Sequence, residues 1–415
     1  MLASLIPLFD ENTAVRAYSL FAQKKNYLLN PSMLGTGSLD GAGTILGLEV
    51  VESLGAGTLD DNQEVFVELS KISVFSPIEE ACSMPHEKVV LLFDPSLPPE
   101  EMYIKRLQQL KFMKYKLAIK NLPIEQFEAY APILKLLDYI MLDYKKLNMQ
   151  AARNFFSKVY PDISLIAVNV DSIEDYEELA KGGAYSLYEG DFYRLPVTKG
   201  TTKVAPLKVN YIELLKIVNN PDFELTKAAD VIGRDTALVI ELLRMVNHMA
   251  INSEITSIRH AAAMLGQKEL KKWINAVVSH ELCADKPNEI TRLSLLRAKF
   301  AENLAPTFEM AALSSELFLM GLFSVLDIIL DKPMKEALEM VNVSKEIADA
   351  LVNKNGEMAR VFNFIENYEL ASWSELSRQM IIYNIKEAPV YDAYIEALSW
   401  YRDLFGTAEE NKKGK

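Results

Sequence analysis

The first half of the chain alternates between short apolar runs and amphipathic segments. The apolar runs are rich in β-branched residues and predict strands over Thr44–Val50, Val65–Leu69, Lys88–Phe93, Tyr115–Ile119, Tyr139–Leu142 and Ser164–Val170. Helical spacing lies between several of them, over Glu101–Met113, Pro123–Leu137 and Ile173–Gly182. Strands that alternate with helices form parallel sheets. This half therefore predicts a (β/α) barrel of the TIM type, with fewer residues than the ~250 typical of that fold.

The pattern changes after Leu195–Leu207, a segment with two prolines and no periodicity. From Tyr211 onward nearly every segment has helical spacing, which predicts an all-α second domain. We therefore expect a barrel domain over residues 1–197, a linker over 198–204, a helical domain over 205–405 and a disordered tail over 406–415.

Charge and cysteine content narrow the class of protein. The chain has 415 residues and a formal net charge of -13, which repels phosphate backbones and argues against nucleic-acid binding. Its two cysteines, Cys82 and Cys283, lie far apart, as suits a reducing compartment. The longest apolar stretch, Leu317–Leu330, is too short to span a bilayer, and the first residues lack a signal-peptide pattern. We expect a cytoplasmic protein without a membrane span.

Few residues offer catalytic chemistry. The chain has four histidines, and none of them belongs to a His-Asp doublet or to a metal-binding helical pair. No glycine-rich phosphate-binding loop follows a predicted strand. Barrel enzymes place their polar groups at the carboxyl ends of the strands. At four of the predicted ends, Leu92–Phe93, Lys120–Asn121, Met141–Asp143 and Val168–Asn169, Asp143 is the only carboxylate. The residues themselves predict that the chain is not an enzyme and holds neither cofactor nor metal.

Several segments of the first half occur in the order of a known family. They are AYSLFAQ (Ala17–Gln23), VELS (Val67–Ser70), VVLLF (Val89–Phe93), LAIKNL (Leu117–Leu122), DYIMLD (Asp138–Asp143), LIAVNVDS (Leu165–Ser172) and YEGDFYRLP (Tyr188–Pro196). On these segments the first half resembles an EAL domain, the (β/α) barrel of cyclic di-GMP phosphodiesterases.

The resemblance also implies where the family's functional residues would stand. Active members hold two divalent metals with carboxylates and an asparagine, and the metals activate water. In this sequence the corresponding positions are largely replaced. The replaced positions are Ser19, Gln23, Glu68, Leu92, Lys120, Asn121, Met141, Val168 and Glu189. Asp143 is retained, and we expect it to pair with Lys120.

The second half resembles an HDOD domain, a helical relative of the metal-dependent HD hydrolases. The resemblance rests on RDTALVIELLRMVNHMA (Arg234–Ala250) and on ITSIRHAAAMLGQKELKKW (Ile255–Trp273). Metal-dependent relatives carry a His-Asp doublet where this chain has Ser324 and Val325. The resemblance therefore implies no metal site in this half.

The two modules in this order resemble bacterial EAL–HDOD signalling proteins. This implies a non-catalytic regulatory protein of a cyclic di-GMP pathway, which acts on motility or biofilm formation through unidentified protein partners. One alternative is a sensor that binds cyclic di-GMP or another nucleotide without hydrolysis. Another is a residual cyclic di-GMP phosphodiesterase. The sequence is compatible with a homodimer and does not decide the oligomeric state.

Overall fold

The computed structural model describes residues 2–23, 45–54, 63–81, 83–194, 206–220, 222–249, 255, 257–284, 286 and 288–410. The chain divides into two compact units. The first, the barrel unit, comprises Met1–Leu195 together with Glu366–Lys415. The second, the helical unit, comprises Pro196–Ile365. The barrel unit is therefore built from both ends of the chain.

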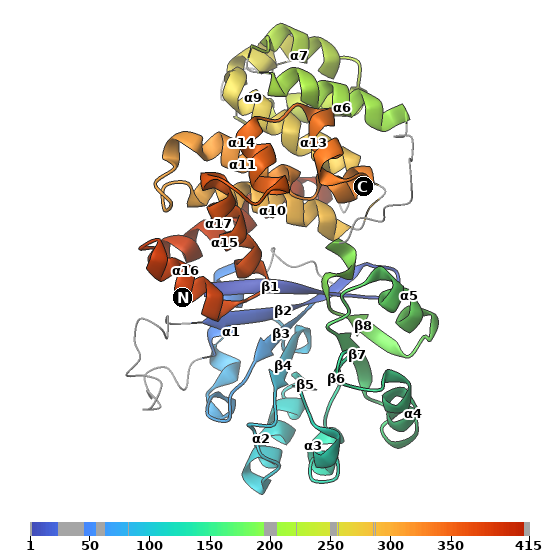
Figure 1. Ribbon diagram of the computed structural model, residues 1–415. Coiled ribbons are helices and arrows are strands. Elements are labelled where there is room, and N and C mark those ends of the chain that lie inside the picture. The colour runs from blue at the N-terminus through green and yellow to red at the C-terminus, as the bar shows by residue number, and fades with distance from the viewer. Residues whose placement is uncertain are drawn as a thin grey trace. The chain divides into compact units, whose positions relative to one another are not determined.

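A closed barrel, with its strands in the order β1 to β8, forms the centre of the barrel unit (Figure 1). From β2 to β8 each strand is parallel to the next, whereas β1 is antiparallel to both β2 and β8. The strands are β1 (Leu2–Phe9), β2 (Val15–Gln23), β3 (Glu64–Glu68), β4 (Val89–Phe93), β5 (Lys116–Lys120), β6 (Tyr139–Asp143), β7 (Ser164–Val168) and β8 (Tyr185–Tyr188). The predicted barrel fold is confirmed.

The strand predictions were right in the middle of the barrel and wrong at its start. Strands β3 to β7 lie where the apolar runs predicted them. The run Thr44–Val50 was predicted as a strand, but the helix α1 (Leu46–Leu54) occupies it. A short apolar run fits a buried helix as well as a strand, because periodicity alone does not separate them. Strands β1, β2 and β8 were not predicted from the sequence.

Helices cover the outside of the barrel (Figure 1), and apolar side chains fill its inside. The elements that follow α1 in this layer are α2 (Glu101–Phe112), α3 (Ala131–Leu134), α4 (Met149–Val159), α5 (Ile173–Lys181) and the 3-10 helix η6 (Asp191–Arg194). The inner cluster includes Phe66, Ile166 and Leu187. Below this cluster, at the amino end of the strands, Lys116 forms an ion pair with Glu64. The inner core and this ion pair leave the carboxyl ends of the strands as the end that can hold a site.

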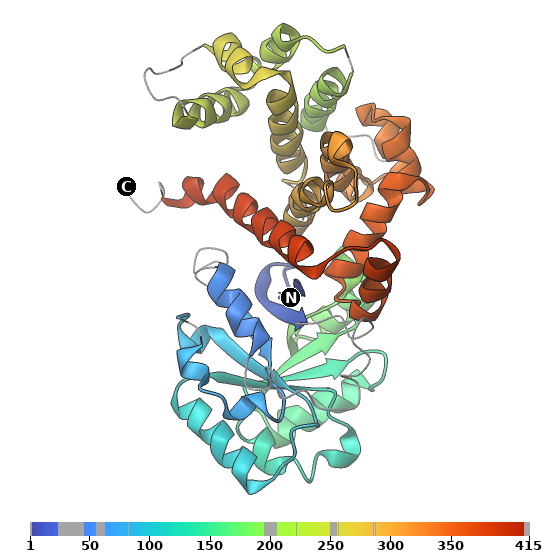
Figure 2. The same ribbon diagram turned by 90° about the vertical axis from the view of Figure 1, so that its left-hand side faces the viewer.

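The C-terminal helices belong to the barrel unit. They are the last turn of α15 (Glu357–Glu369), α16 (Trp373–Ile382) and α17 (Glu387–Glu410). Helix α17, red in Figure 2, lies beside both β1 and α1. The predicted division put these helices with the helical domain up to residue 405. The structure groups the residues after Glu366 with the barrel instead, because their apolar faces cover β1.

The edge of β1 that faces away from β2 is open over most of its length, because β1 meets β8 only at Phe9 and Tyr188. Successive residues of a strand direct their N–H groups to opposite edges, so Ala3, Leu5 and Pro7 share the open edge. The Ala3 N–H donates to the Tyr368 hydroxyl at 3.2 Å. The Leu5 N–H donates to the Tyr394 hydroxyl at 3.3 Å, and Pro7 has no N–H to satisfy. The C-terminal helices thus complete the strand that the barrel leaves unpaired.

Helices alone make up the described part of the helical unit, which confirms the predicted all-α fold. They are α6 (Pro206–Asn219), α7 (Leu225–Ile232), α8 (Thr236–Met249), α9 (Ile258–Leu282), α10 (Asn288–Leu304), α11 (Ser314–Phe323), α12 (Leu326–Leu330), α13 (Met334–Val341), α14 (Lys345–Val352) and the larger part of α15. Helix α9 is kinked at Gly266, whose φ of 74° favours glycine. Among the described helices, none combines the length and apolar character needed to cross a membrane.

Two predicted segments fall wholly or partly outside the described residues. The predicted linker, 198–204, lies entirely outside them. The predicted disordered tail begins at 406, but α17 continues to Glu410. The last residues of that tail, 411–415, lie outside the described residues.

Candidate functional site

Most of the site positions predicted from the sequence lie at one end of the barrel. This end, formed by the carboxyl ends of β2 to β8, is called the mouth below. Glu68, Lys120 and Asp143 are the last residues of β3, β5 and β6, and Glu189 directly follows β8. Two further positions, Leu92 and Met141, are part of the barrel's apolar core, and Val168 packs against it. The mouth therefore has a few charged groups above an apolar floor.

Lys120 and Glu68 form an ion pair across the mouth. The Lys120 ammonium also lies 5.3 Å from the centre of the Phe21 ring, close enough for a cation–π contact. The Lys120 side chain is 24% exposed and that of Glu68 is 42% exposed, so water screens the pair. The ion pair thus joins the end of β5 to the end of β3, with β4 between them, and neutralises both charges.

Asp143 is held by groups from its own loop. Its Oδ2 lies 2.8 Å from the Lys146 ammonium, and its Oδ1 accepts from the Lys145 N–H at 3.0 Å. Burial alone would raise the pKa of Asp143, but hydrogen bonds from Lys146, Asn169 and Lys145 lower it overall. The expected pairing of Asp143 with Lys120 is wrong, because Lys146 is three residues away in the sequence and reaches the carboxylate first.

Glu189 is the most perturbed acid of the mouth. Burial raises its pKa to about 7, Lys120 opposes this rise, and the carboxylates of Asp191, Asp143 and Asp171 add to it. A carboxyl group with such a pKa exists in both protonation states near neutral pH. General acid–base catalysis is most efficient when the pKa of the catalytic group lies near the working pH.

The loop that carries Glu189 is tied to the strand beside it. The Glu189 N–H donates to the Ala167 carbonyl at 2.8 Å, and the Val170 N–H donates to the Glu189 carbonyl at 3.0 Å. Next to it, Gly190 has a φ of 152°, and a Cβ at this position would lie 1.9 Å from the Val170 carbonyl oxygen. Only glycine fits such an approach, so the backbone fixes where the Glu189 side chain starts.

The remaining predicted positions contribute less to the mouth. Ser19 is buried on β2, and its hydroxyl has no hydrogen-bond partner among the described residues. Gln23 is buried at the end of the same strand. Asn121 is exposed just after β5, with a positive φ of 54°. Ser19 is the one unpartnered buried hydroxyl in this group.

The residues of the mouth do not fit the two-metal centre that the EAL resemblance implies. Glu68 is paired with Lys120, and the side chains of Leu92 and Val168 have no atom that could bind a cation. Over the described part of the chain, no three His, Cys, Asp or Glu side chains are placed to hold a metal ion. The chemistry available at the mouth is therefore that of its charged side chains.

In the helical unit, a buried arginine contacts the position where metal-dependent relatives carry the His-Asp doublet. Arg297 donates to the Ser324 hydroxyl at 3.1 Å, and Ser324 donates to the Gly321 carbonyl at 2.7 Å. Val325, the second position of the replaced doublet, is fully buried. The structure thus places both positions in a packed region held by a guanidinium group.

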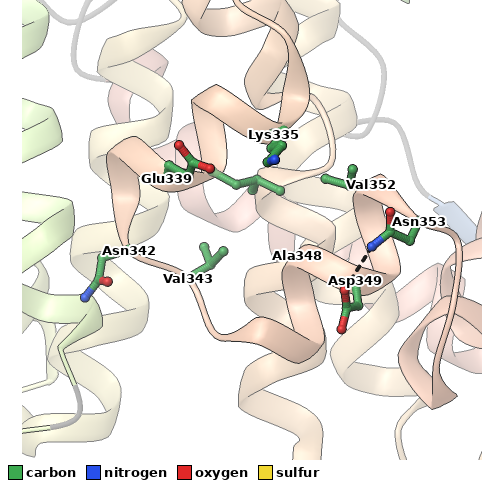
Figure 3. A pocket seen from close by; sticks show the side chains of 9 residues that line it. Lys335, Glu339, Asn342, Val343, Ala348, Asp349, Val352 and Asn353 are labelled. Atoms are coloured by element: carbon green, nitrogen blue, oxygen red, sulfur yellow. Dashed lines mark hydrogen bonds between the residues drawn. The ribbon is translucent and has the colours of Figure 1, made fainter.

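A pocket of about 450 Å³ lies between α13 and α14 of the helical unit. Figure 3 shows its side chains, with Val343, Ala348 and Val352 as the apolar part and Lys335 and Glu339 on the rim. None of the predicted site residues lines this pocket. No sequence pattern predicted this pocket, because its side chains come from the facing surfaces of two short amphipathic helices.

Two charged residues near the mouth were missed by the sequence reasoning. Asp171 follows β7 and forms an ion pair with Lys145. Arg194 ends η6, with Asp191 3.3 Å away. Arg194 could have been noticed, because it belongs to the closing segment YEGDFYRLP on which the resemblance rests. Asp171 lies in a loop with no distinguishing pattern.

Comparison with known proteins supports both halves of the resemblance. Residues 204–359 match the model of the HDOD domain. A cyclic di-GMP phosphodiesterase of Vibrio cholerae, CdgJ, is 25% identical over 331 residues, which cover 78% of this chain and 75% of CdgJ. The uncharacterized protein YuxH of Bacillus subtilis is 24% identical over 96% of this chain and 97% of its own length. One similar solved structure is the EAL enzyme Bd1971, with a TM-score of 0.37, 11% identity, and coverage of 45% of this chain and 60% of that one.

These comparisons correct one prediction. The replaced residues at the strand ends predicted that the chain is not an enzyme, and this is contradicted by the relationship to CdgJ, which is named as a phosphodiesterase. The prediction failed because it treated the residues at aligned positions as decisive. Polar side chains at other positions, such as Asp171, can also supply reactive groups to a barrel mouth, and so can a replacement that is itself acidic, such as Glu189.

Proposed function

Because the chain is related to the EAL–HDOD proteins of cyclic di-GMP signalling, we propose that it is a regulatory protein of such a pathway, acting in the cytoplasm through contacts with protein partners. The observation that carries this proposal is the presence in one chain of an HDOD domain and of a barrel related to a cyclic di-GMP phosphodiesterase. The cytoplasmic location is supported by the two cysteines, Cys82 and Cys283, which lie far apart in the sequence, as suits a reducing compartment.

The proposal is tested in the native bacterium. The gene is deleted, and cyclic di-GMP level, motility and biofilm formation are compared with those of a complemented strain. The full-length protein is also cross-linked in cells and isolated with its partners. We expect a changed phenotype and a partner that makes, degrades or binds cyclic di-GMP. Unchanged phenotypes, or partners without any link to this nucleotide, would contradict the proposal.

Hydrolysis of cyclic di-GMP is a second candidate function. It is favoured by the relationship to CdgJ and by Glu189, whose pKa of about 7 suits general acid–base chemistry. In this case Glu189 would hold and release a proton at the mouth. The Lys120–Glu68 ion pair would have to open to admit an anionic substrate, because it occupies the same end of the barrel.

A hydrolysis assay on the purified full-length protein decides this candidate. Turnover of cyclic di-GMP is followed with Mg²⁺, with Mn²⁺ and with a chelator, next to titration calorimetry for binding alone. We expect Glu189→Gln to abolish turnover and Glu177→Gln, an exposed change on α5, to leave it intact. Binding without turnover would instead identify a sensor, and the absence of both would remove the nucleotide from this site.

A further inference from the structure

The pocket between α13 and α14 lies between two facing rows of side chains. Residues three or four apart share one face of a helix, so each helix contributes one row. The row from α13 and its end consists of Lys335, Leu338, Glu339 and Asn342. The row from α14 and its end consists of Ala348, Asp349, Val352 and Asn353, and Val343 comes from the turn between the helices (Figure 3). The pocket is thus built from one continuous segment, 335–353, inside the helical unit.

Buried apolar side chains anchor both helices of the pocket. They are Ala337, Leu338 and Val341 of α13 and Ile347, Ala350 and Leu351 of α14. Asn342 ends α13 with a φ of 57°, and the Ser344 hydroxyl caps α14 by accepting from the Ile347 N–H at 3.4 Å. The turn between the helices is therefore short and defined. A pocket that is formed before its ligand arrives needs little ordering on binding.

Aliphatic side chains form the apolar wall of the pocket. Leu338 is 2% exposed, whereas Val352 is 39% exposed. Val343 and Ala348 are half-buried. A ligand with an aliphatic group of its own would remove the exposed part of Val352 from water, which favours binding. None of the nine lining residues is aromatic, so the pocket offers no ring on which a nucleotide base could stack.

The charged side chains of the pocket are not paired with one another. Lys335 and Glu339 lie one turn apart on α13, but among the described residues neither has a hydrogen-bond or ion-pair partner for its side chain. Asp349 differs, because its Oδ1 accepts from Nδ2 of Asn353 at 2.9 Å, which orients the carboxylate. The pocket therefore offers one cation and two carboxylates beside an aliphatic wall. A ligand that matches this pattern carries an anionic group, a cationic group and an aliphatic part.

We propose that this pocket binds short aliphatic peptides with free termini. The carboxylate of the peptide pairs with Lys335, its ammonium group is attracted by Glu339 and Asp349, and its side chains pack on Val343 and Val352. The volume of about 450 Å³ lies in the lower part of the range of small-ligand sites, ~300–1,000 Å³, which suits a peptide of about two or three residues. The two carboxylates repel phosphate groups, so a nucleotide matches the pocket poorly.

Titration calorimetry of the full-length protein with the dipeptide leucyl-leucine tests the proposal. The matched probe is the same dipeptide with an acetylated amino end and an amidated carboxyl end, which keeps the side chains and removes both charges. We expect leucyl-leucine to bind with a Kd on the order of 1 mM or below and the blocked dipeptide to bind about ten-fold more weakly. No binding at concentrations on the order of 10 mM, or equal binding of the two probes, would overturn the proposal.

A pair of lysine variants tests the role of the charged rim. Lys335→Gln removes the cation of the pocket, and Lys227→Gln removes a lysine of α7 whose side chain is 66% exposed. Both changes lie at the surface, so the fold is expected to tolerate them. We expect about ten-fold weaker binding of leucyl-leucine in Lys335→Gln only. Unchanged affinity in Lys335→Gln, or an equal loss in both variants, refutes the pairing with Lys335.

Amide hydrogen exchange locates the bound dipeptide in the unaltered chain. We expect saturating leucyl-leucine to slow exchange over residues 342–353 and to leave α7, residues 225–232, unchanged. Protection confined to another segment would show that the dipeptide binds elsewhere and would contradict the proposal. Because none of these measurements uses cyclic di-GMP, their outcome is independent of the hydrolysis assay at the mouth.

Discussion

Two neighbouring residues, Glu189 and Gly190, decide the chemistry and the geometry of the mouth. The carboxyl group of Glu189 is partly withdrawn from water and surrounded by other carboxylates. The backbone of Gly190 packs closely against the Val170 backbone and so fixes the position of the neighbouring Glu189 backbone. Each property leads to a prediction at the scale of a single side chain.

We predict that Glu189 makes the free energy of unfolding depend on pH. Its folded pKa of about 7 lies above the ordinary value of 4.5, so the neutral form stabilises the fold. This stabilisation is complete below pH 4.5 and is lost as pH rises to 7, by about 1–3 kcal/mol after solvent screening is allowed for. Urea unfolding at several pH values measures it. Glu189→Gln should lack this fall, and a curve parallel to that of the wild type would contradict the assignment.

We predict that Gly190→Ala destabilises the barrel unit by more than about 2 kcal/mol, because the new Cβ would collide with the Val170 carbonyl in a strained backbone conformation. Gly183→Ala is the matched control. Gly183 has a φ of 61° with open space around its missing Cβ, so only the backbone cost of about 1 kcal/mol remains. Urea unfolding compares the two. An equal decrease in the free energy of unfolding of both variants would show that the contact with Val170 does not contribute to the destabilisation.

At the scale of elements, β1 depends on helices that are distant in the sequence. Tyr368 and Tyr394 are buried and their rings lie 4.9 Å apart, so the two hydroxyls reach adjacent donors on the same strand edge. Proline at position 7 removes the next donor on that edge. Two side-chain hydroxyls thus accept hydrogen bonds from the open edge of β1, where a neighbouring strand would otherwise supply backbone carbonyls.

We predict that Tyr368→Phe and Tyr394→Phe each lower the free energy of unfolding by about 1–3 kcal/mol, because each leaves a buried β1 N–H without an acceptor. Tyr103→Phe, at a half-buried position of α2, serves as the control and should change it by less than about 0.5 kcal/mol. Urea unfolding of the full chain gives all three values. A double variant as stable as the wild type would mean that water replaces the hydroxyls.

These elements also show which parts of the fold and of the site could be predicted from the sequence. Strands β3 to β7 were predicted because their buried faces give continuous apolar runs. Strands β1 and β2 were missed, since LASLIPLF was read only for its lack of a signal-peptide pattern and AYSLFAQ only as a family landmark. The partner of Asp143 was predicted wrongly because Lys146 and Lys120 are equally plausible by charge. The contacts of Tyr368 depend on tertiary packing, for which local sequence carries no signal.

At the scale of the whole molecule, the helical unit is an insertion between two parts of the barrel unit. The sequence suggested a barrel that is short of residues, and the structure supplies the missing cover from α16 and α17. The two parts of the barrel unit that flank the insertion lie close together, because Arg194 contacts Glu369 at 3.3 Å. A short linker should therefore be able to replace the helical unit without distorting the barrel.

We predict that residues 1–195, joined to residues 366–415 by a flexible Gly/Ser linker, fold into a stable barrel. A linker of about ten residues has an end-to-end distance of ~17 Å, which is ample for the short gap. Residues 1–195 alone should not fold, because the open edge and outer face of β1 would be bare. Circular dichroism and urea unfolding distinguish the two chains. A cooperative transition in residues 1–195 alone would refute this view.

The split barrel has a consequence for synthesis on the ribosome. After Leu195 emerges, the roughly 170 residues of the helical unit must be made before Tyr368 and Tyr394 exist. At about 5–20 residues per second this takes ~10–35 s, during which the nascent first half displays an unfinished strand. Pro7 also disfavours aggregation at this stage, because a strand edge that lacks one N–H donor pairs poorly with a neighbouring nascent chain. The inserted unit, which needs nothing made after Ile365 to be complete, is expected to fold first.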